Sequence, residues 1–173
     1  MKTYDEYLEQ LIILVEDAVC DGDYPLAERL LFNGLLDEPG YAKLHYFKAW
    51  MHHYYQINKA LADKHYKLAL YFDDKYEDAF KGLVALYFEN KKYKALEILF
   101  ENVKEKKFLE KEYIFQNLGK LAEIKGNYQL AVYYYREALM HCLENDALKS
   151  INDNIKRSRL KYFKKKWKWL PIK

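Results

Sequence analysis

Two helices joined by a tight turn are predicted by residues 115–138, FQNLGKLAEIKGNYQLAVYYYREA, and this stretch decides the fold. Apolar residues recur at three- and four-residue spacing up to Ala122, which places them on one face of a helix. Gly126 then marks a turn, because glycine readily adopts the backbone conformation that ends a helix. Ala131 and Tyr135 follow four residues apart on a second helix. The stretch therefore predicts a helical hairpin.

The same alanine, followed four residues later by a bulky apolar residue, recurs along the chain. The pairs are Ala27/Leu31, Ala62/Tyr66, Ala95/Leu99 and Ala131/Tyr135, and their alanines are 35, 33 and 36 residues apart. Two antiparallel helices approach closely where one presents only a methyl group, and the bulky residue fills the space beside that contact. The interval therefore predicts four helical hairpins of about 35 residues each.

The residues around these pairs resemble the tetratricopeptide-repeat family over roughly residues 5–145. The last unit carries the family's first-helix spacing, and the first unit carries similar residues; these are Phe115, Leu118, Gly119 and Ala122, and Leu11, Leu14, Val15 and Ala18. The middle units depart from the pattern. The second lacks the glycine turn and has an extra residue near 56–58, and the third has residues 90–93 in place of the turn. Sel1-like or other α-solenoid hairpins remain alternatives.

The pattern predicts an all-α fold, an α-solenoid of four antiparallel helical hairpins with a C-terminal capping helix. The predicted helices lie near residues 4–20, 24–37, 41–56, 59–73, 76–89, 92–106, 110–125 and 128–144, and a ninth begins near Asp146. The last hairpin of a solenoid has an uncovered apolar face, which a terminal helix commonly covers. We therefore expect a repeat domain at residues 1–145, followed by a capping helix and basic aromatic tail at residues 146–173.

Signatures of catalytic chemistry are missing from the sequence. There is no phosphate-binding glycine loop and no G-x-S-x-G motif, and the only serines are Ser150 and Ser158. Four histidines fall in the second hairpin without a metal-binding motif; they are His45, His52, His53 and His65. The sequence therefore predicts no enzyme, no cofactor and no metal site, with the histidines partly buried or lining a groove.

The compartment predicted by the sequence is the cytoplasm. The first twenty residues carry five acidic side chains, and no stretch approaches the roughly 18 uncharged apolar residues that span a membrane. Cys20 and Cys142 lie far apart without metal-ligand spacing, which is typical of free thiols in a reducing compartment.

A binding groove is implied by the family resemblance, because the first helix of each hairpin lines the groove of tetratricopeptide arrays. The expected peptide-binding residues are Tyr46, Trp50, His53, Tyr54, Leu86, Tyr113, Gln116 and Lys120. Ile12 and Glu16 stand where the family's carboxylate clamp needs a basic residue and an amide, so the resemblance does not imply binding of an acidic peptide terminus.

The centre of this groove is predicted to be aromatic, since Tyr46, Trp50 and Tyr54 follow one another at four-residue spacing. Aromatic side chains provide large contact areas at interaction hot spots. The same spacing is also typical of packing against a neighbouring helix. Both interpretations stay open at the level of sequence.

The C-terminal residues 156–173, KRSRLKYFKKKWKWLPIK, hold nine basic side chains and no acidic one. Projected on a helix, most apolar side chains from Leu148 onward share one half of the circumference. The basic and aromatic residues of interest are Lys161, Lys164, Lys165, Trp167, Lys168 and Trp169. Three interpretations are open: a long capping helix whose aromatic residues dock on the fourth hairpin, an amphipathic helix on an anionic membrane surface, or a nucleic-acid-binding segment.

The net charge of +3 conceals an uneven distribution, because residues 1–38 hold ten acidic and only two basic side chains. The acidic beginning and the basic tail could attract each other between molecules, which would give head-to-tail self-association. The function predicted is a non-catalytic adaptor that binds a protein or peptide in its groove. The alternatives are a chaperone of the tetratricopeptide type for secreted or assembling subunits, and a membrane- or RNA-associated factor that binds through its tail.

Overall fold

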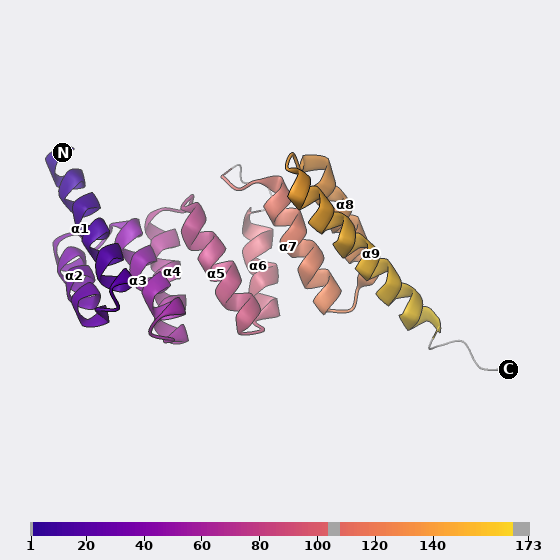
Figure 1. Ribbon diagram of the computed structural model, residues 1–173, viewed down its shortest axis with the longest axis horizontal. Coiled ribbons are helices and arrows are strands. Elements are labelled where there is room, and N and C mark those ends of the chain that lie inside the picture. The colour runs from indigo at the N-terminus through magenta and orange to yellow at the C-terminus, as the bar shows by residue number, and fades with distance from the viewer. Residues whose placement is uncertain (1, 104–107, 168–173) are drawn as a thin grey trace. The chain divides into compact units, whose positions relative to one another are not determined.

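The computed structural model describes residues 2–103 and 108–167, and it is all-α over these ranges. The helices are α1 (Lys2–Cys20), α2 (Tyr24–Asp37), α3 (Ala42–Tyr54), α4 (Lys59–Phe72), α5 (Glu77–Glu89), α6 (Tyr93–Val103), α7 (Lys111–Ile124), α8 (Tyr128–His141) and α9 (Asn145–Trp167) (Figure 1). They pack as adjacent pairs, as an α-solenoid with a terminal helix does, which confirms the predicted fold class. Within these ranges, no helix combines the length and apolar character needed to cross a membrane.

The chain divides into two compact units between residues 92 and 93. The first unit contains α1 to α5, and its core is built from α1, α2 and α3 around Leu31 and Leu44, both fully buried. The second contains α6 to α9, and its core joins α7, α8 and α9 around Ala131, Tyr135 and Ile151. The predicted boundary at residue 145 stays a prediction.

Left-handed backbone conformations mark the turns between the two helices of each repeat. Positive φ angles occur at Gly22, Ile57, Lys91 and Gly126, which are 35, 34 and 35 residues apart. After Gly22, Ile57 and Gly126, the next residue is an Asp or Asn whose side chain accepts a hydrogen bond from the backbone N–H three residues on. Such N-caps stabilise a helix by about 1 kcal/mol each. The left-handed residue, which is present in all four turns, therefore defines the period of the repeat.

The second turn contains the extra residue that the sequence indicated near residues 56–58. In the first and last turns, the backbone N–H of the capping residue bonds to a carbonyl five residues earlier; one example runs from Asn127 to Ala122 at 2.9 Å. In the second turn, the N–H of Asn58 reaches the carbonyl of His52 at 2.8 Å, which is six residues earlier. The insertion therefore lies at the end of α3.

The third alanine pair predicted from sequence is wrong by one residue. Ala95 and Leu99 are only partly buried, whereas Leu96 and Phe100 are 0% and 1% exposed. Leu96 lies five residues after the left-handed residue Lys91, as Ala27, Ala62 and Ala131 lie five after theirs. The buried position of the third repeat is thus filled by leucine, and the correct interval is 35, 34 and 35 residues.

Close helix packing depends on two glycines that face tyrosine rings. A Cβ atom added to Gly82 would lie 2.4 Å from the ring of Tyr66, and one added to Gly119 would lie 2.6 Å from the ring of Tyr135. Both tyrosines are almost fully buried. The missing side chain of each glycine therefore makes the space in which a large aromatic residue packs.

Ile57 is expected to be strained, because a β-branched side chain is unfavourable at its φ of 51°. Replacing it by glycine should raise the free energy of unfolding by about 1 kcal/mol, since the side chain is 71% exposed and buries little. Urea unfolding followed by circular dichroism measures the change. Lys91→Gly is the matched variant at the other strained position, and its gain should be smaller because lysine is not β-branched. A loss of stability in Ile57→Gly would contradict the assignment.

Candidate functional site

The first helices of successive hairpins lie next to one another in the first unit, where α3 contacts both α1 and α5. Glu9 of α1 joins two of these helices, because its carboxylate accepts hydrogen bonds from the Tyr41 hydroxyl at 2.7 Å and from the Lys43 ammonium. Both contacts lower the pKa of Glu9, with the Lys43 contact the stronger. We call the surface formed by α1, α3 and α5 the first-helix face.

Tyr46, Trp50 and Tyr54 all lie on α3, but they differ in exposure. Tyr46 is half-buried, with its ring 5.3 Å from that of Tyr76. Trp50 is half-buried against Tyr55, at a ring separation of 5.0 Å. Tyr54 is 50% exposed and stacks on the neighbouring imidazole of His53 at 4.1 Å. Tyr46 and Trp50 therefore contribute to packing, and Tyr54 offers the most accessible aromatic surface of the three.

His53 and Leu86 lie in the interior of the first unit. His53 Nε2 is 3.0 Å from a carboxylate oxygen of Glu89, which can only accept, so this nitrogen donates. His53 Nδ1 lies within hydrogen-bond distance of the hydroxyl of Tyr66, at 3.3 Å. Leu86 is fully buried. His53 thus holds Glu89 at the edge of the face, and the binding role of both predicted residues stays a prediction.

The other three predicted groove residues belong to α7 in the second unit. Tyr113, Gln116 and Lys120 follow one another at three- and four-residue spacing, so they share one side of that helix. The amide of Gln116 donates to Glu112 at 2.7 Å, and Lys120 is exposed. The structure therefore places the predicted groove residues in two separate groups, one in each unit.

Acidic side chains surround the aromatic residues of the first-helix face. The pKa of Tyr46 is raised, in decreasing order of effect, by burial, Asp78, Tyr54 and Glu16. Burial and then Glu89 raise the pKa of Tyr54. Carboxylates from α1 and α5 therefore act on these hydroxyls, although burial has the larger effect.

Two contributors to this face were missed at the level of sequence. Tyr76 packs on Tyr46, and Asp78 acts on the same hydroxyl. A signal for Tyr76 existed, because Tyr41 and Tyr76 lie 35 residues apart, each immediately before the first helix of its repeat. Asp78 carried no comparable signal, since its position beside Tyr46 depends on how α5 packs on α3.

The buried histidines of the second hairpin form a neutral pair. His45 Nε2 donates to the carbonyl oxygen of Pro39 at 2.9 Å, so its Nδ1 must accept from His65 Nδ1 at 3.0 Å. Burial, followed by the effect of His45, lowers the pKa of His65 to about 3, and burial also lowers the pKa of His45.

Among the described residues, no group of three His, Cys, Asp or Glu side chains is placed to hold a metal ion.

This histidine pair should make stability depend on pH. Unfolded His65 binds a proton near pH 6.5, whereas the folded residue binds it only near pH 3. Between these values the unfolded state binds more protons, so the free energy of unfolding falls as the pH falls. We expect a loss of about 1 to 2 kcal/mol between pH 7 and pH 5 in urea unfolding.

The variant His65→Gln should reduce this loss, because it removes one of the two titrating groups. The matched control is His141→Gln, since His141 is exposed. Equal stability of the wild-type protein at pH 7 and pH 5 would contradict the neutral pair.

A buried carboxylate anchors α9 in the second unit. Glu123 of α7 is 7% exposed and accepts hydrogen bonds from Arg157 at 2.8 and 2.7 Å, from Lys161 at 2.8 Å and from the Tyr135 hydroxyl at 3.1 Å. The Arg157 contact is the largest influence on Glu123 and, with Lys161, lowers its pKa to about 2. The carboxylate therefore remains charged at physiological pH, and its charge is compensated from α9.

The structure separates the predicted tail residues by role. Lys161 binds Glu123, and Lys165 donates to the carbonyl of Gly126 at 3.1 Å. Lys164 and Trp167 are exposed, the latter by 72%. The predicted residues Lys168 and Trp169 lie outside the described part of the chain.

One of the three open interpretations of the tail, in which its aromatic residues dock on the fourth hairpin, does not hold for Phe163 and Trp167. They are 56% and 72% exposed, whereas Tyr162 is half-buried and accepts a hydrogen bond from Gln129 at 3.0 Å. The helical projection of the sequence placed most apolar residues in one half of the helix. The docking surface occupies only part of that half, around Ile151 and Ile155.

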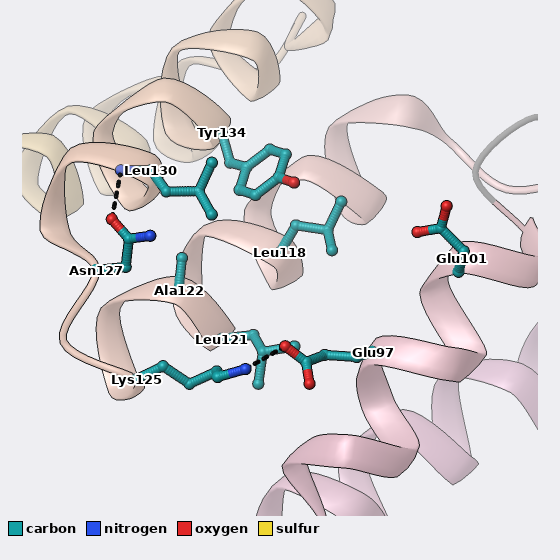
Figure 2. Close-up of a pocket in the computed structure, with 9 residues that line it drawn as sticks. All are labelled: Glu97, Glu101, Leu118, Leu121, Ala122, Lys125, Asn127, Leu130 and Tyr134. Carbon is teal, nitrogen blue, oxygen red and sulfur yellow. Dashed lines mark hydrogen bonds and ion pairs between the residues drawn. The ribbon is translucent and has the colours of Figure 1, made fainter.

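A small pocket of about 250 Å³ lies between α6, α7 and α8. Figure 2 shows apolar side chains, including Leu118 and Leu130, on its α7 and α8 side. Glu97 and Lys125 form an ion pair across one side of it. Its volume lies below the usual range for small-molecule sites, so we do not assign it a ligand.

Comparisons with known proteins relate the chain to others through structure. No protein-family model matches the sequence, and no curated protein is similar to it in sequence. The solved structure of PilF from Pseudomonas aeruginosa is similar with a TM-score of 0.74 and 20% identity, over 92% of this chain and 71% of PilF. BtubC from P. vanneervenii is similar with a TM-score of 0.71 and 16% identity, over 90% of this chain and 72% of BtubC. These likenesses show that the chain has the tetratricopeptide-repeat fold.

Proposed function

We propose that the protein is a non-catalytic scaffold that binds a peptide or protein segment on the first-helix face of its first unit. The fold supports this proposal, because tetratricopeptide-repeat proteins typically serve as protein-interaction scaffolds. The observation that carries it is the accessible ring of Tyr54, which lies beside two half-buried aromatic side chains. An amphipathic ring on a rigid helix offers contact area without a large loss of rotamer freedom.

The partner that suits this surface carries basic side chains. Glu16, Asp78 and Glu89 are exposed around the aromatic residues, and each acts electrostatically on Tyr46 or Tyr54. Lysine or arginine side chains can pair with these carboxylates while their methylene groups lie against the rings. A segment that alternates basic and apolar residues therefore meets both properties of the face.

A non-catalytic role is supported by what the polar groups of the described residues do. Three of the four histidines in the second hairpin have at least one ring nitrogen in an internal hydrogen bond. His52 is 4% exposed, and its Nε2 lies 3.5 Å from a carboxylate oxygen of Glu28. All four histidines are buried, so they belong to the interior of the first unit. We further propose that the protein acts in the cytoplasm, which suits its free thiols at Cys20 and Cys142.

The peptide-binding surface is tested by selecting peptides from a random displayed library on the immobilised full-length protein. Tyr54→Ala should weaken binding of the selected peptides by about tenfold or more, since hot-spot truncations cost more than 1 kcal/mol. Tyr71→Ala is the matched control, because Tyr71 is 79% exposed on α4, which is not one of the first helices. Peptides that bind Tyr54→Ala as tightly as the wild-type protein would place binding elsewhere.

The charge of the partner is tested with the same peptides. Glu16→Gln should weaken basic peptides several-fold at low salt, and the effect should shrink as the salt concentration rises. Asp17→Asn is the matched control, since the neighbouring residue points about 100° away around α1. Selected peptides without excess lysine or arginine would contradict the acidic face.

Head-to-tail self-association is a narrower part of the proposal. It is supported by the ten acidic side chains in residues 1–38 and the nine basic ones in residues 156–173. Association driven by these charges should be strong at low salt and weak at high salt. Light scattering at both salt concentrations measures it, and a monomer under both conditions would end this part of the proposal.

A further inference from the structure

The rotation of α9 about its own axis is fixed by contacts along most of its length. Ile151 and Ile155 are buried in the core of the second unit, and Ser158 is fully buried one turn further on. Arg157 is held by Glu123, as described above, and Lys165 reaches the carbonyl of Gly126. A helix held in this way presents a defined face to the outside.

That outward face is apolar along its middle. Leu160, Phe163 and Trp167 are 62%, 56% and 72% exposed, and they follow one another at three- and four-residue spacing. At 100° per residue, they lie on average about 140° from the buried side chains around the helix axis. The helix therefore keeps three large apolar side chains exposed to water. It could bury them only by rotating about its own axis, and the contacts of Glu123 oppose that rotation.

Cations border this apolar row on both sides. Arg159 and Lys166 lie on one side of it and Lys164 on the other, by the same helical projection. All three are exposed, and within the described ranges the structure gives them no hydrogen bond or ion pair. No acidic residue follows Asp153 in the sequence. We call Leu160, Phe163 and Trp167, together with these three cations, the outer stripe.

We propose that the outer stripe docks on an anionic lipid surface. The apolar row would enter the boundary between headgroups and acyl chains, and the cations on each side would extend to lipid phosphates. Trp167, near the end of the row, has the amphipathic ring that is favoured at this boundary. This interaction uses a surface different from the first-helix face, so it stands independently of the proposed peptide binding.

The arrangement fits lipid better than nucleic acid. Leu160, the first residue of the row, has no ring with which to stack on a base, so on a nucleic acid it would place an aliphatic side chain against the charged backbone. At a membrane, an aliphatic side chain at this position can enter the apolar boundary beside Phe163 and Trp167. The row of apolar side chains with cations on both sides therefore favours a lipid surface.

Flotation of the full-length protein with vesicles tests the proposal. Vesicles of phosphatidylcholine with one quarter phosphatidylglycerol should bind the protein, and pure phosphatidylcholine vesicles should bind it much more weakly. Replacing Arg159, Lys164 and Lys166 together by glutamine should weaken binding about 100-fold, because each cation contributes about fivefold. Phe163→Ser should weaken it about tenfold. The contacts of Glu123 remain in all these variants, and circular dichroism checks that they fold.

Matched controls distinguish the outer stripe from general charge and hydrophobicity. Lys59, Lys94 and Arg136 are exposed elsewhere, so replacing these three by glutamine removes the same charge and should change binding by less than about threefold. Met140→Ser removes a 79% exposed apolar side chain from α8 and should leave binding unchanged. Equal losses in the charge-matched variants, or no binding of the wild-type protein to anionic vesicles, would overturn the proposal. The proposal would also be overturned, in favour of nucleic acid, by two results together. The wild-type protein would bind a single-stranded oligonucleotide more tightly than anionic vesicles, and the triple variant of the stripe would lose that binding.

Discussion

Close packing at one position in each second helix is the constraint on which the fold depends. Ala27, Ala62, Leu96 and Ala131 are fully buried there, and the residue four positions later is at most 1% exposed in every repeat. A left-handed residue always lies five positions earlier, so the turn sets which side of the second helix faces inward. The exposed residues of the first-helix face are positioned by this internal arrangement.

Most of the fold could be predicted from the sequence because the residue types that define the repeat act on local structure. Glycine and Asn or Asp specify the first and last turns, and the helix bounds there agree closely with the structure. The third repeat was misregistered because Lys91 takes the left-handed conformation without glycine to mark it. Ala95 then matched the pattern by identity, whereas burial selects Leu96. Residue identity alone therefore does not fix register where a turn is atypical.

Candidate sites were less predictable than helices because they depend on contacts between elements. The spacing of Tyr46, Trp50 and Tyr54 was visible, but the acidic side chains near them belong to other helices. The same limit applied to α9. A helical projection predicts which residues share a side, but the contacts of Glu123, which no local pattern revealed, determine which part of that side is buried.

Glu123 also has a consequence for the order in which the protein is made. Most helix contacts join helices that are consecutive in the chain, so each hairpin can assemble soon after it leaves the ribosome. The buried carboxylate of Glu123 depends on a later helix, because Arg157 and Lys161 are synthesised more than thirty residues later. Until then, its burial would leave a charge without compensation, which is strongly unfavourable. The fourth hairpin therefore completes its packing only when α9 has been translated.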